Sequence, residues 1–424
     1  MTKRTPTRAK TTARIAAGTA APRSLPVEID ATGKSPLGMS PAQFLRDYWQ
    51  KRPLLIRNAF PGYVSPVTPE DLAGLACEDG ALARIARYDR KKDAWAVRSG
   101  PFAEAEFPGM PHQDWTLLVQ DVDKWDPEIR ALLDAFDFLP RWRMDDIMIS
   151  FAAPGGSVGA HIDQYDVFLL QGLGHRRWMI DTAPNPDQTY LDDVPLRLLK
   201  HFAPTHDWVL APGDMLYIPP GVPHHGVAED VCMTISVGLR APSSAELLGD
   251  FVDTLICDAD EAVRYADPDL APAQDAYEID ADAMARAIEA LNKLRMHDPE
   301  RLGDWFGRFI SLYRSAGMPL DPDPPRSRIE VEFDLQQGAV LARHPWTRAA
   351  WRRDGIDKRR ARLYLGGQAH GLPLADARTL AAAETLDADV YAGLGEDART
   401  VALDLLAQGH YHLALPDDGN DDDA

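Results

Sequence analysis

Five short β-prone segments lie between about residues 145 and 242, and they constrain the fold of this chain more than any other feature. They read IMISFAA, YDVFLLQ, RRWMID, DMLYIPP and VCMTISVGL, and turns rich in glycine and proline separate them. Many short strands joined by such turns are typical of a barrel or a sandwich, whereas a parallel sheet alternates strands with helices. We therefore predict a β barrel here and expect the chemistry of the chain to lie in it.

A capped helix and a strand are expected before the barrel, in SPAQFLRDYWQKRPLLIRNAF. Ser40 has the position of an N-cap, and Phe44, Leu45 and Tyr48 share the inner face of the helix. Pro53 then opens the strand. The folded part of the chain should begin with this helix.

The region after residue 242 has a helical pattern. Apolar residues recur at helical spacing over 247–256, 284–294 and 305–312, which predicts an all-helical segment. Its apolar faces could pack on the barrel or on a second copy of the chain, and the sequence does not separate these alternatives.

A small unit follows the helical segment. The sequence PLDPDPP, at 319–325, predicts a stiff linker. Beyond it we expect strands around Glu330 to Ala342, a hairpin turn at Gly366-Gly367, and helices near Leu374 to Leu386 and Thr400 to Gln408.

Charge limits the kinds of partner that suit this chain. It has 424 residues, with 45 lysines and arginines against 65 aspartates and glutamates, so its formal net charge is −20. A general nucleic-acid-coating role is therefore disfavoured, and a basic partner suits the chain better. The basic residues of the C-terminal unit could still form a phosphate-binding face, although a solvated or partner-facing surface is the preferred interpretation: Arg343, Arg348, Arg352, Arg353, Lys358, Arg359, Arg360 and Arg362.

The two ends of the chain are expected to be disordered tails. The first 24 residues contain six lysines and arginines and no acidic residue, and residues 417–423 contain five aspartates. The basic tail could instead be a mitochondrial transit peptide or a segment that contacts RNA or an acidic surface.

Cysteines and hydropathy favour the reducing cytoplasm. Cys77, Cys232 and Cys257 form no C-x-x-C pair, so neither a disulfide framework nor a cysteine-rich zinc site is implied. No run of about 18 apolar residues is present, and a membrane-spanning helix is therefore not expected.

The strongest local chemical signal is His161-Ile162-Asp163. In a strand, residues i and i+2 project from the same face, so His161 and Asp163 can present an imidazole and a carboxylate to one point while Ile162 faces away. Chance and ordinary surface hydrogen bonding also produce this pattern. Taken alone, it is half of a metal site.

A second histidine signal follows in APGDMLYIPPGVPHHG, at 211–226. A short apolar strand and a proline-rich turn deliver His224 and His225 to an adjoining strand, and only one of these neighbours can easily point inward. Two histidines and one carboxylate can form a facial triad that leaves three metal positions open, as in non-haem Fe(II) oxygenases. Zinc is more often tetrahedral.

Arg176 and Arg177 supply a candidate anchor for a second ligand. A 2-oxo dicarboxylate that chelates iron through its keto-acid end needs a fixed cation at its far carboxylate, and the planar fork of arginine meets a carboxylate bidentately. Alternation along the strand makes one of the two arginines face inward. A surface cationic pair is the alternative interpretation.

Four stretches together resemble the bacterial ribosomal oxygenases of the JmjC/cupin superfamily. They are SPAQFLRDYWQKRPLLIRNAF, DWTLLVQDVDKW, MDDIMISFAAPGGSVGAHIDQYDVFLLQGLGHRRW and PGDMLYIPPGVPHHGVAEDVCMTISVGLRAPSSAEL. The resemblance implies an α+β chain in which a double-stranded β-helix (jelly-roll, cupin, JmjC) barrel precedes a helical dimerisation region and a winged-helix-like C-terminal domain. The expected limits are a disordered basic tail 1–35, a catalytic domain 36–243, a helical region 244–318, a linker 319–328, a winged-helix-like domain 329–416 and an acidic tail 417–424.

The resemblance also assigns residues. His161, Asp163 and His224 match the family's metal ligands, because its Pro-His-x-Gly pattern aligns with Pro223-His224-His225-Gly226 and leaves His225 at the variable position. Arg176 matches the residue that binds the C5 carboxylate of 2-oxoglutarate, and Ser150 matches a position near the same cosubstrate.

The implied activity is the decarboxylation of 2-oxoglutarate to succinate and CO₂, coupled to Fe(II)- and O₂-dependent hydroxylation of a protein, with C3 of an arginine in ribosomal protein L16 as the target. A cytoplasmic homodimer is implied. Tyr165 and Asp166 could touch the target guanidinium or could instead complete hydrogen bonds within the barrel. Two alternatives stay open: another target, such as a histidine or another basic protein, or a non-enzymatic metal-binding cupin whose C-terminus contacts nucleic acid.

Overall fold

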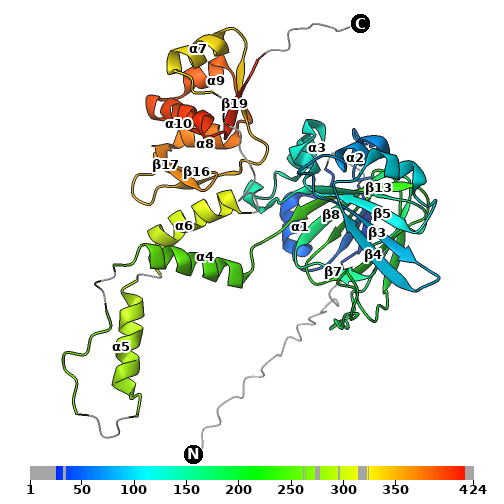
Figure 1. Cartoon of the computed structure of the whole chain (residues 1–424), viewed down its shortest axis with the longest axis horizontal. Helices are drawn as coiled ribbons and strands as arrows, with labels where there is room; N and C mark the ends of the chain where they lie inside the picture. Colours follow the sequence, from blue (N-terminus) through cyan, green and yellow to red (C-terminus); the bar gives the residue numbers. More distant parts are fainter. Residues whose placement is uncertain are drawn as a thin grey trace, which may run out of the picture.

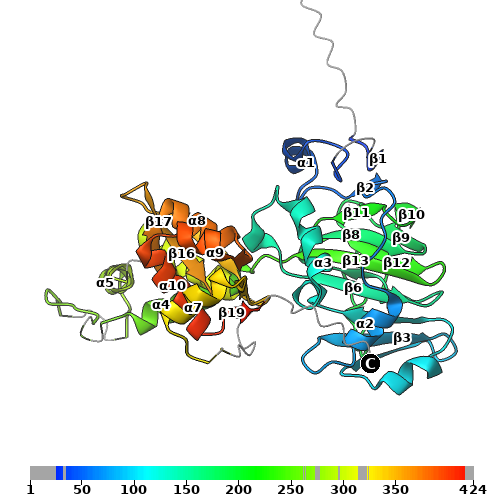
Figure 2. The same cartoon turned by 90° about the horizontal axis from the view of Figure 1, so that it is seen from above.

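A barrel and a smaller C-terminal domain are joined through helices in the computed structural model of the chain (Figures 1 and 2). The structure describes residues 25–31, 35–260, 262, 264–272, 277–294, 297–313, 322 and 324–415. The basic tail up to residue 24, the acidic tail 417–424 and residues 319–321 and 323 of the expected linker lie outside the described residues. The predicted order of barrel, helical segment and small C-terminal unit is confirmed.

Two sheets form the barrel. Its strands are β1 (Glu28–Asp30), β2 (Leu54–Arg57), β3 (Ala83–Asp89), β4 (Ala94–Ser99), β5 (Trp115–Val119), β6 (Ile147–Ala152), β7 (His161–Ile162), β8 (Asp166–Leu173), β9 (Arg176–Ile180), β10 (His206–Leu210), β11 (Met215–Ile218), β12 (Pro223–Ala228) and β13 (Cys232–Leu239). The larger sheet has the order β1-β2-β11-β8-β13-β6-β5-β3-β4, and the smaller one has the order β10-β9-β12-β7. The strands that carry the predicted site residues lie in both sheets, so the site lies between them.

Short helices surround the barrel. They are α1 (Pro41–Asp47), α2 (Pro69–Leu75), α3 (Pro127–Ala131) and the 3₁₀ helices η1 (Glu104–Gly109), η2 (Val122–Lys124), η3 (Leu132–Phe136) and η4 (Arg141–Arg143). The Ser40 side chain caps α1 by accepting a hydrogen bond from the Gln43 amide, as predicted. Phe44 is fully buried and packs against Phe168 and Tyr217 of the barrel.

The ordered chain begins earlier than the sequence suggested. Strand β1 pairs in parallel with β2, with Glu28 opposite Leu55 and Asp30 opposite Arg57. Strand β1 therefore lies within residues 1–35, which the sequence analysis assigned to a disordered tail. The reason is local, because Arg57 also pairs with Glu28 and fixes the added strand at the sheet edge.

The helical segment contains α4 (Ser244–Cys257), α5 (Ala281–Asn292) and α6 (Pro299–Leu312). Phe251 and Leu255 of α4 pack on Trp305 of α6, whose indole donates a hydrogen bond to Asp250. Helix α5 has no buried residue. The apolar face of α4 is thus partly covered within the chain, whereas that of α5 is not.

The C-terminal domain has its own core. It contains α7 (Arg328–Gln336), β14 (Val340–Arg343), β15 (Ala349–Arg353), β16 (Arg360–Leu365), β17 (Gln368–Pro373), α8 (Leu374–Ala382), β18 (Thr385–Leu386), α9 (Ala388–Gly393), α10 (Glu396–Ala407) and β19 (Tyr411–Ala414). Its strands form two three-stranded sheets, β18-β14-β19 and β15-β16-β17. The hairpin turn at Gly366-Gly367 is confirmed, since both glycines have positive φ between β16 and β17.

The strand expected from Glu330 is wrong, because α7 occupies that segment. Ser327 and Glu330 form a capping box at its start, and Val331 and Leu335, four residues apart, are both buried. The short apolar run has the spacing of a helix face, and a strand begins only at Val340.

Among the described residues, no helix has the length and apolar character needed to cross a membrane.

Candidate functional site

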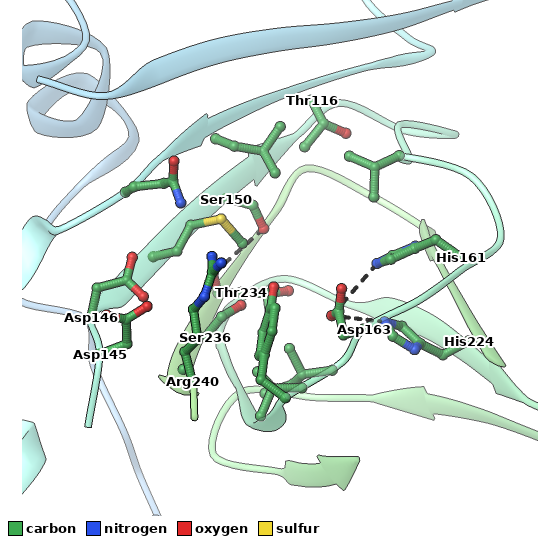
Figure 3. A pocket seen from close by; sticks show the side chains of 18 of the residues that line it. Thr116, Asp145, Asp146, Ser150, His161, Asp163, His224, Thr234, Ser236 and Arg240 are labelled. Atoms are coloured by element: carbon green, nitrogen blue, oxygen red, sulfur yellow. Dashed lines mark hydrogen bonds and ion pairs between the residues drawn. The ribbon is translucent and has the colours of Figure 1, made fainter. Parts of the chain in front are cut away.

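A cavity between the two barrel sheets contains most of the residues singled out from the sequence (Figure 3). It encloses about 800 Å³, including its open mouth. Strands β5, β6, β8, β9, β12 and β13 all contribute to its lining: Thr116, Leu118, Met148, Ser150, Val167, Leu169, Arg176, Trp178, His224, Thr234 and Ser236. The apolar members of this lining limit the access of water, which strengthens electrostatic interactions inside the cavity.

His161, Asp163 and His224 meet at one side of this cavity. His161 lies directly opposite His224 in the antiparallel pair of β7 and β12, and Asp163 follows β7. The Asp163 carboxylate lies 3.8 Å from Nε2 of His161 and 3.6 Å from Nε2 of His224. All three candidate ligand atoms lie within 4.8 Å of one another, which is the geometry expected of a facial triad.

The backbone orients both imidazoles. Nδ1 of His161 lies 3.0 Å from the Gly159 carbonyl, and Nδ1 of His224 lies 3.0 Å from the Val222 carbonyl. A proton on Nδ1 donated to a carbonyl leaves the Nε2 lone pair free toward Asp163. Burial, followed by the neighbouring His161, lowers the pKa of His224 to about 4. The residues therefore fit a divalent metal that takes two neutral imidazoles and a carboxylate.

His225 points away from this cluster, as alternation along a strand requires. Its Nε2 lies 3.0 Å from the Ser157 hydroxyl, and His225 is not part of the His161, Asp163 and His224 group. Burial, rather than a charged partner, is the main cause that lowers the pKa of His225 to about 4. Of the two adjacent histidines, the structure thus directs His224 to the cluster.

Arg176 is a buried cation on β9, next to β12. It is only 2% exposed, and its Nε and Nη1 have no hydrogen-bond partner among the described residues. Burial lowers the pKa of this guanidinium, so an anionic ligand would compensate a charge that the protein leaves unsatisfied. Arg177, by contrast, is partly exposed and pairs with Asp207 and Glu229.

Glycine is required at position 226 by this arginine. A Cβ there would lie 2.8 Å from Nε of Arg176 and 2.8 Å from the Trp178 ring. The glycine of the Pro-His-His-Gly sequence therefore gives the guanidinium its space beside β12.

Ser150, the fifth residue assigned from the sequence, is buried on β6 and lines the same cavity. Its hydroxyl lies 3.5 Å from the Thr234 carbonyl of β13, which is a long hydrogen bond. The hydroxyl therefore keeps capacity for a further partner.

The opposite side of the cavity is acidic, and sequence analysis missed it. Asp145 and Asp146 precede β6 and line the cavity together with Tyr165 and Arg240. Figure 3 shows the two carboxylates across from His161 and His224, with the Arg240 side chain beside them. Burial, followed by the Asp121 and Asp145 carboxylates, raises the pKa of Asp146 to about 7.

The interpretation of Asp166 as a substrate contact is wrong. This side chain is 1% exposed and accepts hydrogen bonds from Tyr217 at 2.6 Å and Gln50 at 2.9 Å, with Arg143 at 3.3 Å. It thus completes a network within the barrel, as the alternative interpretation held. Tyr165 does line the cavity, and burial raises its pKa.

The basic residues of the C-terminal domain are largely paired. Arg352 pairs with Glu300, Arg362 with Asp304 and Arg359 with Asp357. Such pairing leaves little uncompensated positive charge for a phosphate backbone.

Two family models match the chain, one over most of the barrel and one over the C-terminal domain. Residues 131–247 match the JmjC domain, and residues 293–412 match the ROXA-like winged helix. The barrel with its His-Asp-His cluster is therefore of the JmjC class.

Two known proteins are similar to this chain in sequence. The ribosomal protein uL16 3-hydroxylase of Escherichia coli is 39% identical over 307 residues, which are 71% of this chain and 79% of that protein. The probable ribosomal oxygenase of Haemophilus influenzae is 41% identical over 236 residues, which are 55% of this chain and 58% of that protein. The chain belongs to the ribosomal oxygenase family.

Solved structures agree with this assignment. The X-ray structure of E. coli YcfD has a TM-score of 0.79 and 34% identity, and the match covers 88% of this chain and 98% of that one. YcfD, called a ribosomal oxygenase, in complex with cobalt and 2-oxoglutarate gives a TM-score of 0.76 at 34% identity with the same coverage.

Proposed function

We propose that this chain is an Fe(II)- and 2-oxoglutarate-dependent protein hydroxylase that acts on C3 of an arginine in ribosomal protein uL16 (L16). The observation that carries the proposal is a single cavity that joins the cluster of His161, Asp163 and His224 to the unsatisfied guanidinium of Arg176. A redox metal and a dicarboxylate cosubstrate explain both features together.

The His-Asp-His cluster would hold the iron. Nε2 of His161, Nε2 of His224 and a carboxylate oxygen of Asp163 supply three ligands on one face, and the backbone carbonyls of Gly159 and Val222 fix the imidazole tautomers. Bound Fe(II) supplies the oxygen chemistry in which O₂ and 2-oxoglutarate yield succinate, CO₂ and a hydroxylated product. A metal held by these three residues would keep room for a keto acid and O₂.

Arg176 would bind the C5 carboxylate of 2-oxoglutarate. Within the described part of the chain its Nε and Nη1 are donors without a hydrogen-bond partner, and burial makes an ion pair there stronger than at the surface. Ser150, on β6 of the same cavity, would donate a hydrogen bond from its hydroxyl to the cosubstrate. The apolar side chains of Val167, Leu169 and Trp178 exclude water from the bound keto acid.

The acidic side of the cavity favours a cationic target. Asp145 and Asp146 would accept hydrogen bonds from a guanidinium, and Tyr165 would offer an aromatic face to it. Burial and the neighbouring Asp121 and Asp145 carboxylates raise the pKa of Asp146, and the positive charge of a bound arginine would lower it. The net charge of −20 also suits a basic ribosomal protein.

The proposal is tested by product analysis. The chain is loaded anaerobically with Fe(II), then given 2-oxoglutarate, O₂ and a uL16 fragment, and the fragment is examined by mass spectrometry. We expect one added oxygen on an arginine with the wild type and none with His161→Ala. Succinate without a modified arginine would retain the oxygenase and reject the substrate, and neither product would reject the activity.

A different target is the second candidate. A histidine or another basic protein would also suit an acidic cavity, and a panel of ribosomal-protein fragments in the same assay separates these from arginine. A non-enzymatic cupin that contacts nucleic acid is disfavoured, because the arginines of its C-terminal domain are paired with acidic residues.

We propose that the active form is a cytoplasmic homodimer. Met284, Ile288 and Leu291 of α5 are each more than half exposed and lie on one helix face. A second copy would bury this face, in keeping with a dimerisation region at 244–318 between a catalytic domain 36–243 and a winged-helix-like domain 329–416.

A further inference from the structure

The wall segment, residues 142–146, separates two hollows of the molecule. It runs from the end of η4 to the start of β6. Asp145 and Asp146 line the catalytic cavity on one side, and they also line a groove between the barrel and the C-terminal domain on the other. The position of this segment therefore determines the shape of the acidic side of the catalytic cavity.

Arg348 of the C-terminal domain reaches across the groove to the wall segment. Its Nη2 donates to the Trp142 carbonyl at 3.0 Å and to the Met144 carbonyl at 2.7 Å, and its Nη1 lies 3.6 Å from the Asp145 carboxylate. The Arg348 and Asp145 side chains are only 15% and 12% exposed. A charged donor thus satisfies two carbonyls and one carboxylate in a partly buried place, where such bonds are strong.

Other parts of the chain fix the wall segment from different directions. Arg143, within η4, pairs with the buried Asp166 of β8 at 3.3 Å. The Trp142 ring makes an edge contact with Phe306 of α6, at 5.6 Å between centroids. The Asp145 amide donates to the Gly238 carbonyl of β13. Arg348 adds to these contacts an ion pair with the Asp145 carboxylate.

We infer that Arg348 is a positioning residue for substrate recognition, through which the winged-helix-like domain holds the wall segment and orients Asp145 at the catalytic cavity. The inference rests on the proposed function, because it assigns a role to Asp145 in binding the target arginine. The C-terminal domain is then part of the substrate site, although no residue of that domain lines the catalytic cavity.

The role predicts a selective kinetic effect. Arg348→Ala removes the two carbonyl contacts and the ion pair, so the KM for a uL16 peptide should rise about tenfold, the loss expected for charge-assisted hydrogen bonds. The kcat and the KM for 2-oxoglutarate should stay within about twofold, because the His-Asp-His cluster and Arg176 do not contact Arg348. Arg348→Lys keeps the charge beside Asp145 but loses the planar fork, so its peptide KM should lie between those of the wild type and Arg348→Ala.

The experiment compares wild type, Arg348→Lys, Arg348→Ala and the control Arg362→Ala in the holoenzyme. Arg362 belongs to the same domain but pairs with Asp304 of α6, and its loss should leave the peptide KM unchanged. If Arg348→Ala does not fold, Arg348→Lys decides the kinetic question. An unchanged peptide KM in both Arg348 variants overturns the inference, as does an unchanged peptide KM in Arg348→Lys where Arg348→Ala does not fold. An equal rise of the peptide KM in Arg362→Ala also overturns it.

Amide hydrogen exchange of the wall segment gives a readout that needs no substrate. Faster exchange at residues 142–146 in both Arg348 variants, and not in Arg362→Ala, supports the positioning role. Unchanged exchange overturns it, whatever the KM. If the wild type does not hydroxylate the uL16 arginine, the proposed substrate fails, and exchange alone then decides whether Arg348 holds the segment.

Discussion

The two sides of the catalytic cavity are built in different ways. His161, Asp163, His224 and Arg176 all come from β7, β9, β12 and the turn after β7, so a single small sheet positions them. The acidic side depends on contacts with the barrel, with α6 and with the C-terminal domain.

This difference assigns catalysis to one side of the cavity and substrate recognition to the other. The first side needs fixed ligand geometry, which neighbouring strands hold through their backbone hydrogen bonds. In the proposed function the acidic side faces the target, and contacts with the barrel, α6 and the C-terminal domain hold it. Changes on the first side should therefore stop the reaction, whereas changes on the acidic side should alter substrate affinity.

The largest effect is expected from a change in the His-Asp-His cluster. His224→Ala removes one of the three metal ligands. Loss of a residue that only hydrogen-bonds to a ligand lowers metal affinity by up to about a hundredfold, so metal affinity and succinate formation should fall by more than that here. Metal titration and succinate production measure this. The matched control is His225→Ala, which should stay within about tenfold of wild type; equal losses in both variants would show that the wrong histidine had been assigned.

The next effect concerns the cosubstrate. Arg176→Met should raise the KM for 2-oxoglutarate by about a hundredfold, because the carboxylate would lose a buried bidentate partner. Steady-state kinetics with varied 2-oxoglutarate measure it. The neighbouring, partly exposed Arg177→Ala serves as control and should change nothing. An unchanged KM for 2-oxoglutarate in Arg176→Met would show that Arg176 does not bind the C5 carboxylate.

A smaller effect is expected on the acidic side. With a pKa of about 7, Asp146 is mostly neutral below that pH and mostly charged above it, so peptide affinity should rise as the pH increases through 7. The rise should be about tenfold, and Asp146→Asn should bind weakly at every pH. Peptide binding at several pH values tests this, and an equal slope in Asp146→Asn would contradict it.

The smallest effect on activity is expected at α5. Ile288→Glu puts a charge on the exposed apolar face, so sedimentation should change from dimer to monomer, while kcat per chain stays within about twofold. Glu289→Ala, on the same helix, is the control and should remain dimeric. A wild-type chain that sediments as a monomer would remove the dimer from the account.

The first side of the cavity could be predicted from the sequence because its geometry is local. His161 on β7 and Asp163 just after it lie two residues apart and share a face, and the proline-rich turn returns His224 to the adjoining strand. Alternation also reduced Arg176 and Arg177 to one inward candidate. These inferences need only the period of a strand.

The acidic side could not be predicted in this way. Asp145 and Asp146 have no local pattern that distinguishes them from surface acids, and Arg348 is about two hundred residues away in the sequence. Asp166 was misplaced because β8 begins at that residue. Val167 and Leu169 face the cavity, so alternation turns Asp166 to the other side.

The most direct test of the account is the ratio of succinate formed to arginine hydroxylated, measured in the same reaction with the uL16 fragment. The account predicts a ratio near one for the wild type, because both sides of the cavity serve one reaction, and an excess of succinate for Asp146→Asn. Succinate that forms at the same rate with and without the fragment, and no hydroxylated arginine in the wild type, would contradict it.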